Sequence, residues 1–195
     1  MGETGRIRLR YEIVLFFVTT ILLTWLLWLP AFLIQNRGVP MRLPYSFFIT
    51  VGTFAPSAAG FFFTYMFGGK ADVRLLVHSL LNMRIDIKRL LSVFLALPVV
   101  SAVSCLVLYL SGGTLPPMQF PPWFIPIAFV YILVFMGPLG EEAGWRGFAL
   151  NKMLGYLSPL KAAVLLGVIW SFWHLPLFFI SGTTQNALEI GRAHV

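Results

Sequence analysis

The sequence predicts an all-α membrane protein: a polytopic bundle of transmembrane helices with about five spans and one short interfacial helix. Hydrophobic residues make up 58% of the 195 residues and charged residues only 11%, whereas soluble domains carry about 25% charged residues. The mean hydropathy is +0.85, and the apolar residues gather in runs of about 20, the length at which a helix crosses a bilayer. A soluble enzyme and a disordered chain are therefore excluded. A disulfide-rich secreted domain is excluded as well, because the chain has a single cysteine.

Five segments are long and apolar enough to span a membrane, near residues 13–34, 45–67, 90–110, 123–150 and 160–180. The first follows a basic N-terminal segment, as the apolar part of a signal peptide does. Its apolar run is too long for a signal peptide, and no small-residue cleavage site follows, so we expect a retained helix. The second contains Gly60 and other small residues that allow close helix packing, and Pro56, which we expect to kink it.

Between the second and third spans, apolar residues recur at helical spacing and predict a short amphipathic helix at the membrane interface (Val73, Leu76, Val77, Leu80 and Leu81). His78 lies on another face of this helix, and we interpret it as an interfacial polar residue rather than a ligand. The third span that follows contains Pro98. Residues 111–122 are rich in Gly and Pro, which predicts an irregular connection to the fourth span.

The basic residues indicate how the chain is oriented. Lys and Arg gather before the first span, between the second and third spans, and between the fourth and fifth, while residues 111–122 contain none. Because basic loops stay in the cytoplasm, we expect a multi-pass protein with a cytoplasmic N-terminus. The net charge of +7 follows from this topology, and we expect the lipid bilayer rather than a nucleic acid as partner.

Four ionisable residues fall within the predicted spans, where such residues are costly and usually functional (Glu141, Glu142, Arg146 and His174). Glu142 and Arg146 are four residues apart and share a helix face, so they can form an ion pair. For that pair alone, a purely structural role is equally open. Glu141 points about 100° away from Glu142 and can face a cavity. Three tryptophans flank the cluster; packing is their expected role, and lining a cavity is the alternative (Trp145, Trp170 and Trp173).

The spacing of the turn residues predicts that Glu141 and His174 lie at the same depth. Gly155, Ser158 and Pro159 are typical of a turn and would join the fourth and fifth helices into a hairpin. Each of the two residues lies about 16 positions from the turn, roughly 20 Å along its helix. At matching depth they could jointly hold a water or a metal ion, with Glu as general base and His as ligand or proton carrier.

Two motifs in this region resemble those of a known family. Residues 141–146, Glu-Glu-Ala-Gly-Trp-Arg, fit the pattern E-E-x-x-x-R. Residues 170–176 resemble the pattern aromatic-x-x-x-His, with Trp170 where Phe is often found. Together, in a multi-span chain, they resemble the CPBP family of CAAX-processing and bacteriocin-processing intramembrane proteases, also called Abi proteins, and the type II CAAX prenyl endopeptidases among them. The resemblance covers most of the chain.

The resemblance implies an intramembrane endopeptidase that hydrolyses peptide bonds of membrane-associated protein or peptide substrates in a prokaryotic plasma membrane. Eukaryotic members remove the last three residues of prenylated CAAX proteins. Carried over by position, Glu141 would activate the attacking water, Glu142 and Arg146 would support it, and His174 would bind the water or stabilise the oxyanion. No cofactor is assigned. If a divalent metal such as zinc takes part, Glu141 and His174 are its expected ligands in this chain.

Two other classes of function remain open at this point. The chain could be a non-catalytic membrane protein that acts in bacteriocin immunity or as a scaffold. It could also be a small transporter or proton pathway, since buried Glu and His residues serve in proton relays. The transporter ranks last, because the spacing of the polar residues matches a protease motif and no inverted repeat is evident.

A departure from the family concerns the C-terminal region. Family members usually carry a third motif on a later helix, a His followed four residues later by Asn, Asp or His, and this chain does not supply it. Residues 189–195 look like a translated sequencing adapter. We therefore expect residues 1–188 to form an incomplete transmembrane domain that is inactive alone, and residues 189–195 to be a non-native tail whose His194 is not catalytic.

Overall fold

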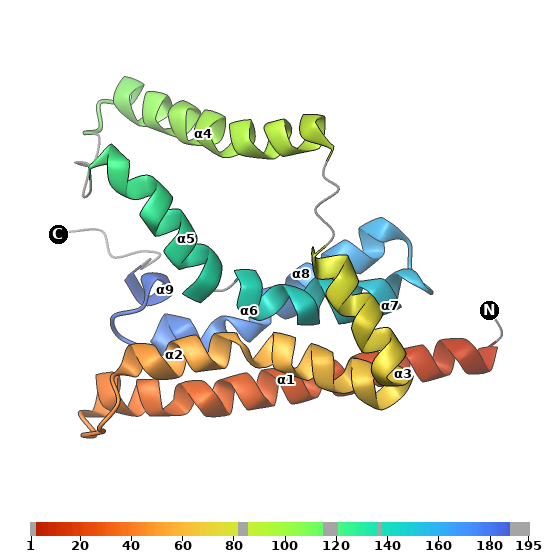
Figure 1. Cartoon of the computed structure of the whole chain (residues 1–195). Coiled ribbons are helices and arrows are strands. Elements are labelled where there is room, and N and C mark those ends of the chain that lie inside the picture. Colours follow the sequence, from red (N-terminus) through yellow and green to blue (C-terminus); the bar gives the residue numbers. More distant parts are fainter. Residues whose placement is uncertain (1–2, 82–85, 115–120, 136–137, 188–195) are drawn as a thin grey trace. The chain divides into compact units, whose positions relative to one another are not determined.

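The computed structural model describes residues 3–81, 86–114, 121–135 and 138–187, and these ranges contain helices and no strand. The predicted all-α class is therefore confirmed (Figure 1). The expected tail, 189–195, lies outside the described residues. In chain order the elements are α1 (Glu3–Arg37), α2 (Tyr45–Thr53), α3 (Ala55–Leu81), α4 (Ile87–Leu110), η1 (Pro122–Phe124), α5 (Ile125–Phe135), α6 (Pro138–Glu142), η2 (Ala143–Leu150), α7 (Asn151–Leu154), α8 (Pro159–Trp173), η3 (Leu175–Phe179) and α9 (Thr184–Ala187).

Among the residues that the structure describes, four helical segments are long and apolar enough to cross a membrane: Ile7–Arg37, Tyr45–Leu81, Ile125–Leu154 and Pro159–Phe179. They match the first, second, fourth and fifth expected spans. The third expected span corresponds to α4, which holds a shorter apolar stretch, Pro98–Leu110. The chain is thus a multi-pass integral membrane protein.

The chain divides into two compact units, Met1–Leu80 with Phe129–Val195, and Leu81–Ala128. The second unit contains α4, which begins where the Asp86 carboxylate accepts the backbone N–H of Lys88 at 3.0 Å, a helix N-cap. α4 contains Pro98 and is followed by Gly112, whose φ is 80°. All four ionisable residues singled out from the sequence lie in the first unit, which is therefore described in more detail.

The second span is interrupted twice. At Phe54 the chain passes from α2 to α3, next to Pro56, which has no N–H to donate to the preceding turn; the predicted kink is confirmed. At Gly69 the backbone leaves the helical region (φ 70°, ψ −164°), and helix resumes through Leu81. The predicted helix over residues 73–81 is confirmed in form, with Leu76 buried. Its position at a membrane interface stays a prediction.

Small residues bring α3 and η2 into close contact. A Cβ atom added to Gly60 would lie 2.7 Å from the Cα of Gly144, and one added to Gly144 would overlap the carbonyl oxygen of Pro56. Neither position has room for a side chain. The expectation that Gly60 permits close packing is confirmed, and the partner helix is the one that follows Glu142.

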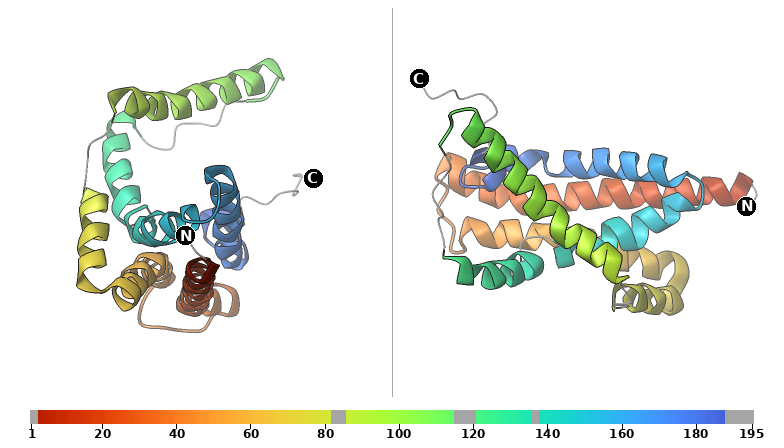
Figure 2. Two further views of the ribbon diagram at one scale, coloured as in Figure 1. Left: turned by 90° about the vertical axis from the view of Figure 1, so that its right-hand side faces the viewer. Right: turned by 90° about the horizontal axis from the view of Figure 1, so that it is seen from above.

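The first unit has two distinct ends, which Figures 1 and 2 show at opposite ends of α1. At the N-terminal end, the Arg10 guanidinium lies 5.6 Å from the ring centroid of Tyr156, in the turn between α7 and α8. At the other end, Asn36 Nδ2 donates a hydrogen bond to the carbonyl of Phe179 at 2.9 Å. The predicted helical hairpin is therefore present, and its turn lies beside the start of α1.

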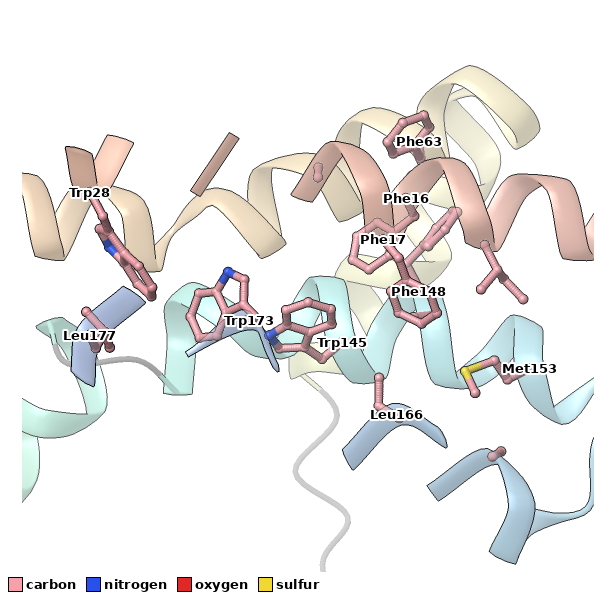
Figure 3. Close-up of a cluster of buried hydrophobic side chains, with 14 of the residues drawn as sticks. Phe16, Phe17, Trp28, Phe63, Trp145, Phe148, Met153, Leu166, Trp173 and Leu177 are labelled. Carbon is pink, nitrogen blue, oxygen red and sulfur yellow. The ribbon is translucent and has the colours of Figure 1, made fainter. Parts of the chain in front are cut away.

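An aromatic core holds α1, α3 and η2 together (Figure 3). The fully buried Phe16 contacts the rings of Phe63, Trp145 and Phe148, with centroid distances of 6.4, 5.6 and 5.0 Å. Such offset and edge-on ring pairs add about 0.5–1.5 kcal/mol each beyond simple burial. The core thus fixes η2, which continues directly from the end of α6, where the two glutamates lie.

A buried carboxylate joins α1 to α7, which was not foreseen from the sequence. Glu12 is 2% exposed, and it pairs with Arg8 Nε at 2.8 Å and with Lys152 Nζ. The expected first span began at residue 13 and left Glu12 outside. In the structure α1 begins at Glu3 and therefore includes Glu12. The Glu12 side chain is buried there, and a buried carboxylate is stable only when cations such as Arg8 and Lys152 pair with it.

Candidate active site

Glu141 is a buried carboxylate near the end of α6. Only 8% of the residue is exposed. The indole nitrogen of Trp170, on α8, donates a hydrogen bond to Glu141 Oε2 at 2.9 Å. A hydrogen bond to a charged acceptor is stronger than one between neutral groups. Glu141 is therefore held by a side chain from the neighbouring helix rather than by a basic residue of its own helix.

Glu142 has a different partner from Glu141. Its carboxylate forms an ion pair with the Arg146 guanidinium, and both side chains are partly exposed, 36% and 62% respectively. The predicted division is confirmed: Arg146 neutralises one acid, while the adjacent acid faces away from it. Two neighbouring carboxylates in one membrane helix can coexist this way because only one of them lacks a counter-ion on the same helix.

The helix after the two glutamates is wound more widely than the sequence predicts. Residues Ala143–Leu150 form a π-helix, with hydrogen bonds from residue i to i+5 instead of i+4. The expected α-helical rotation of about 100° per residue therefore applies only as far as Glu142. The wide turn occurs where Gly144 lies against the backbone of Pro56, so the irregular winding accompanies a close helix contact. π-Helical turns are often found at functional sites.

His174 lies at the C-terminal end of α8, one turn after Trp170. Its Nδ1 lies 2.9 Å from the carbonyl oxygen of Trp170. A carbonyl oxygen can only accept a hydrogen bond, so Nδ1 carries the proton and Nε2 is the ring nitrogen available to a ligand. The imidazole packs edge-on against two indoles, Trp170 at 4.3 Å and Trp173 at 4.5 Å between centroids, which fixes its orientation.

Glu141 and His174 line one cavity of about 280 Å³. The remaining walls come from α1, α2, α5, α8, η3 and the segment after η3. They include apolar side chains and several hydroxyl groups (Trp28, Tyr45, Ser46, Ile49, Thr50, Thr53, Tyr131, Trp173, Leu177, Gly182, Thr183, Thr184 and Gln185). The hydroxyl of Tyr45 donates a hydrogen bond to the carbonyl of Gly182 at 3.2 Å. The cavity is thus bordered by the start of α2 and by residues 182–185, at the end of the first unit opposite the N-terminus.

The structure brings together the two residues that the hairpin predicted to lie at matching depth. Glu142 and Arg146 follow Glu141 in the sequence but do not line this cavity. Trp145 and Trp173 are buried in the core as expected, while Trp173 also lines the cavity. Sequence reasoning assigned Trp170 to packing and missed its bond to Glu141. Trp170 lies one helical turn before His174, and this spacing could have indicated that its side chain faces the same site.

The donors for a metal ion are few. In the part of the chain that the structure describes, no group of three or more His, Cys, Asp or Glu side chains gathers. Glu141 and His174 are the carboxylate and imidazole that line the cavity, whereas catalytic zinc sites take three ligands from the protein. The described donors do not complete a zinc site.

Comparison with known proteins points to one family. Residues 122–190, which contain both motifs, match the family described as type II CAAX prenyl endopeptidase Rce1-like. The chain is also 27% identical over 183 residues, 90% of its length, to CAAX prenyl protease 2 of Methanococcus maripaludis. The matched part spans 66% of that relative's own length. These similarities confirm the resemblance, first indicated by the two motifs, to the Rce1-like type II CAAX prenyl endopeptidases.

Proposed function

We propose that this protein is a membrane-embedded endopeptidase that hydrolyses peptide bonds of membrane-associated protein or peptide substrates. The observation that carries the proposal is the shared cavity of Glu141 and His174. The similarity to CAAX prenyl protease 2 supports the same reaction class. In this proposal Glu141 is the catalytic acid and base, and His174 is the second catalytic residue.

The chemistry follows from the protonation states of the two groups. The Glu141 carboxylate takes a proton from a water in the cavity, and the water oxygen forms a bond to the substrate carbonyl carbon. His174, with its proton on Nδ1, presents the lone pair of Nε2 and accepts a hydrogen bond from the same water, which favours water binding as its role. When the C–N bond breaks, Glu141 returns the proton to the leaving amine.

The remaining site residues have supporting roles. Arg146 neutralises Glu142, so the negative charge near the reacting carbon is limited to Glu141. Ser46 and Thr50 bring hydroxyl groups to the cavity wall, where a donor is needed for the oxyanion of the tetrahedral intermediate. The apolar part of the wall excludes bulk water and strengthens these interactions.

We also propose that the N-terminus is cytoplasmic. The fold brings the basic residues of two connections to one end of the first unit, since Arg8 and Lys152 share Glu12, and Arg10 contacts Tyr156. Basic residues favour the cytoplasmic side. With this orientation, the cavity end of the unit faces away from the cytoplasm.

The proposal is tested by incubating the full-length protein in lipid vesicles with fluorescence-quenched peptides, with and without a lipid anchor. Cleavage of the anchored peptide, lost on Glu141→Gln, is expected. Equal cleavage by the wild-type protein and this variant would contradict the assignment. An anchored peptide that binds without cleavage would favour a non-catalytic role instead.

A further inference from the structure

Trp170 differs from the other tryptophans of the site. Trp145 and Trp173 are each 1% exposed and belong to the aromatic core, whereas Trp170 is 41% exposed. Burial of its ring therefore contributes less to packing than burial of the other two. Its indole N–H and its backbone carbonyl, in contrast, are both engaged with the site.

The side chain of Trp170 holds one oxygen of Glu141. The 2.9 Å bond from the indole N–H reaches Oε2, and an indole nitrogen is a donor only. Glu142, the nearest other charged group in sequence, is occupied by Arg146. Trp145 also interacts with the Glu141 side chain. Because the Trp170 bond ends on Oε2, Oε1 is the oxygen to which we assign the proton taken from water.

The backbone and ring of Trp170 hold His174. The carbonyl oxygen of Trp170 accepts the Nδ1 proton at 2.9 Å, and the indole packs edge-on against the imidazole with a centroid distance of 4.3 Å. One residue on α8 thus contacts both groups that line the cavity. A phenylalanine at this position would keep the ring contact and the backbone bond and would lose the bond to Glu141.

We propose that Trp170 is a positioning residue, whose indole N–H fixes the carboxylate of Glu141 so that Oε1 faces the water bound beside His174. The role in catalysis rests on the proposed endopeptidase function, while the bond itself does not.

Two measurements on Trp170→Phe test the positioning role. In the vesicle assay, kcat is expected to fall about tenfold, the effect of losing one hydrogen bond to a charged group, with KM unchanged. Trp123→Phe, an exposed tryptophan of the other unit, is the matched control with wild-type kcat. A wild-type kcat for Trp170→Phe would overturn the role. So would a loss of total activity that is explained by lower thermal stability, with kcat per folded molecule unchanged.

The bond is tested independently of proteolysis by the indole N–H resonance of Trp170 in detergent-solubilised protein labelled with ¹⁵N-tryptophan. Glu141→Gln is expected to move this resonance upfield, because a neutral amide accepts a weaker hydrogen bond than a carboxylate. An unchanged resonance would overturn the bond. If the wild-type protein cleaves no peptide while the resonance still shifts, the proposed function fails and the contact stands.

Discussion

Glu141, near the end of α6, and His174, at the end of α8, line the same cavity although the turn between their helices lies at the far end of the unit. Trp170 contacts both of them. A hairpin of two helices rising equally from one turn produces this meeting without any long loop. The site is therefore built on regular elements, which hold side chains more firmly than loops do.

His174→Ala is expected to lower kcat about 100-fold, because the water loses a partner that orients it beside Glu141. The imidazole is not part of the aromatic core, so the variant should reach the membrane in normal amounts. Steady-state kinetics in vesicles, corrected for protein abundance by immunoblotting, measure the effect. Retention of wild-type kcat would remove His174 from the catalytic assignment.

Gly144→Ala is expected to destabilise the protein, because the added Cβ would overlap the Pro56 carbonyl and separate α3 from η2. Overpacking of this kind costs about 1–3 kcal/mol. Gly167→Ala on α8 is the matched control, since nothing lies within 4 Å of its added Cβ, and a helical Gly→Ala change alone is stabilising. Thermal unfolding in detergent distinguishes them, and equal midpoints would contradict the close contact.

Glu12→Gln is expected to reduce stability by about 2–4 kcal/mol, because Lys152 loses the buried charge that neutralises it. Glu12 lies away from the cavity, so kcat per folded molecule should not change. Asp72→Asn, at an exposed carboxylate, provides the comparison for removing a charge without burial. The midpoint of thermal unfolding checks this, and a Glu12→Gln midpoint equal to that of Asp72→Asn would exclude the stabilising pair.

The orientation of the chain can be read from single cysteines placed at Arg10 and at Gln185, with Cys105 replaced by serine. These positions lie at opposite ends of the first unit. With a cytoplasmic N-terminus, a membrane-impermeant thiol reagent added to intact cells labels the cysteine at 185 and not the one at 10. The reverse pattern would invert the proposed topology, and labelling of both would contradict the arrangement of the two ends.

The sequence predicts the features that depend on spacing along the chain. The pairing of Glu142 with Arg146 and the common depth of Glu141 and His174 follow from helix geometry and the position of one turn. The helices themselves follow from the apolar runs, because a membrane leaves the backbone few other choices. These predictions agree with the structure because they need no knowledge of how distant segments approach one another.

The features that were missed depend on contacts between distant segments. Glu12 is buried because Lys152, far along the chain, reaches it. The π-helix occurs where Gly144 lies against Pro56 of another helix. Trp170 reaches Glu141 because α8 packs beside η2, the element that continues from the helix of Glu141. Composition and periodicity contain none of these distances.

The catalytic role of Glu141 is tested most directly by the rate at which Glu141→Gln cleaves a lipid-anchored, fluorescence-quenched peptide in vesicles. The variant keeps the size of the side chain and its capacity to accept the Trp170 hydrogen bond, while removing the base. If Glu141 is the base, kcat falls to at least about 100-fold below that of the wild-type protein, with equal abundance and unfolding midpoint. Cleavage at the wild-type rate would contradict it.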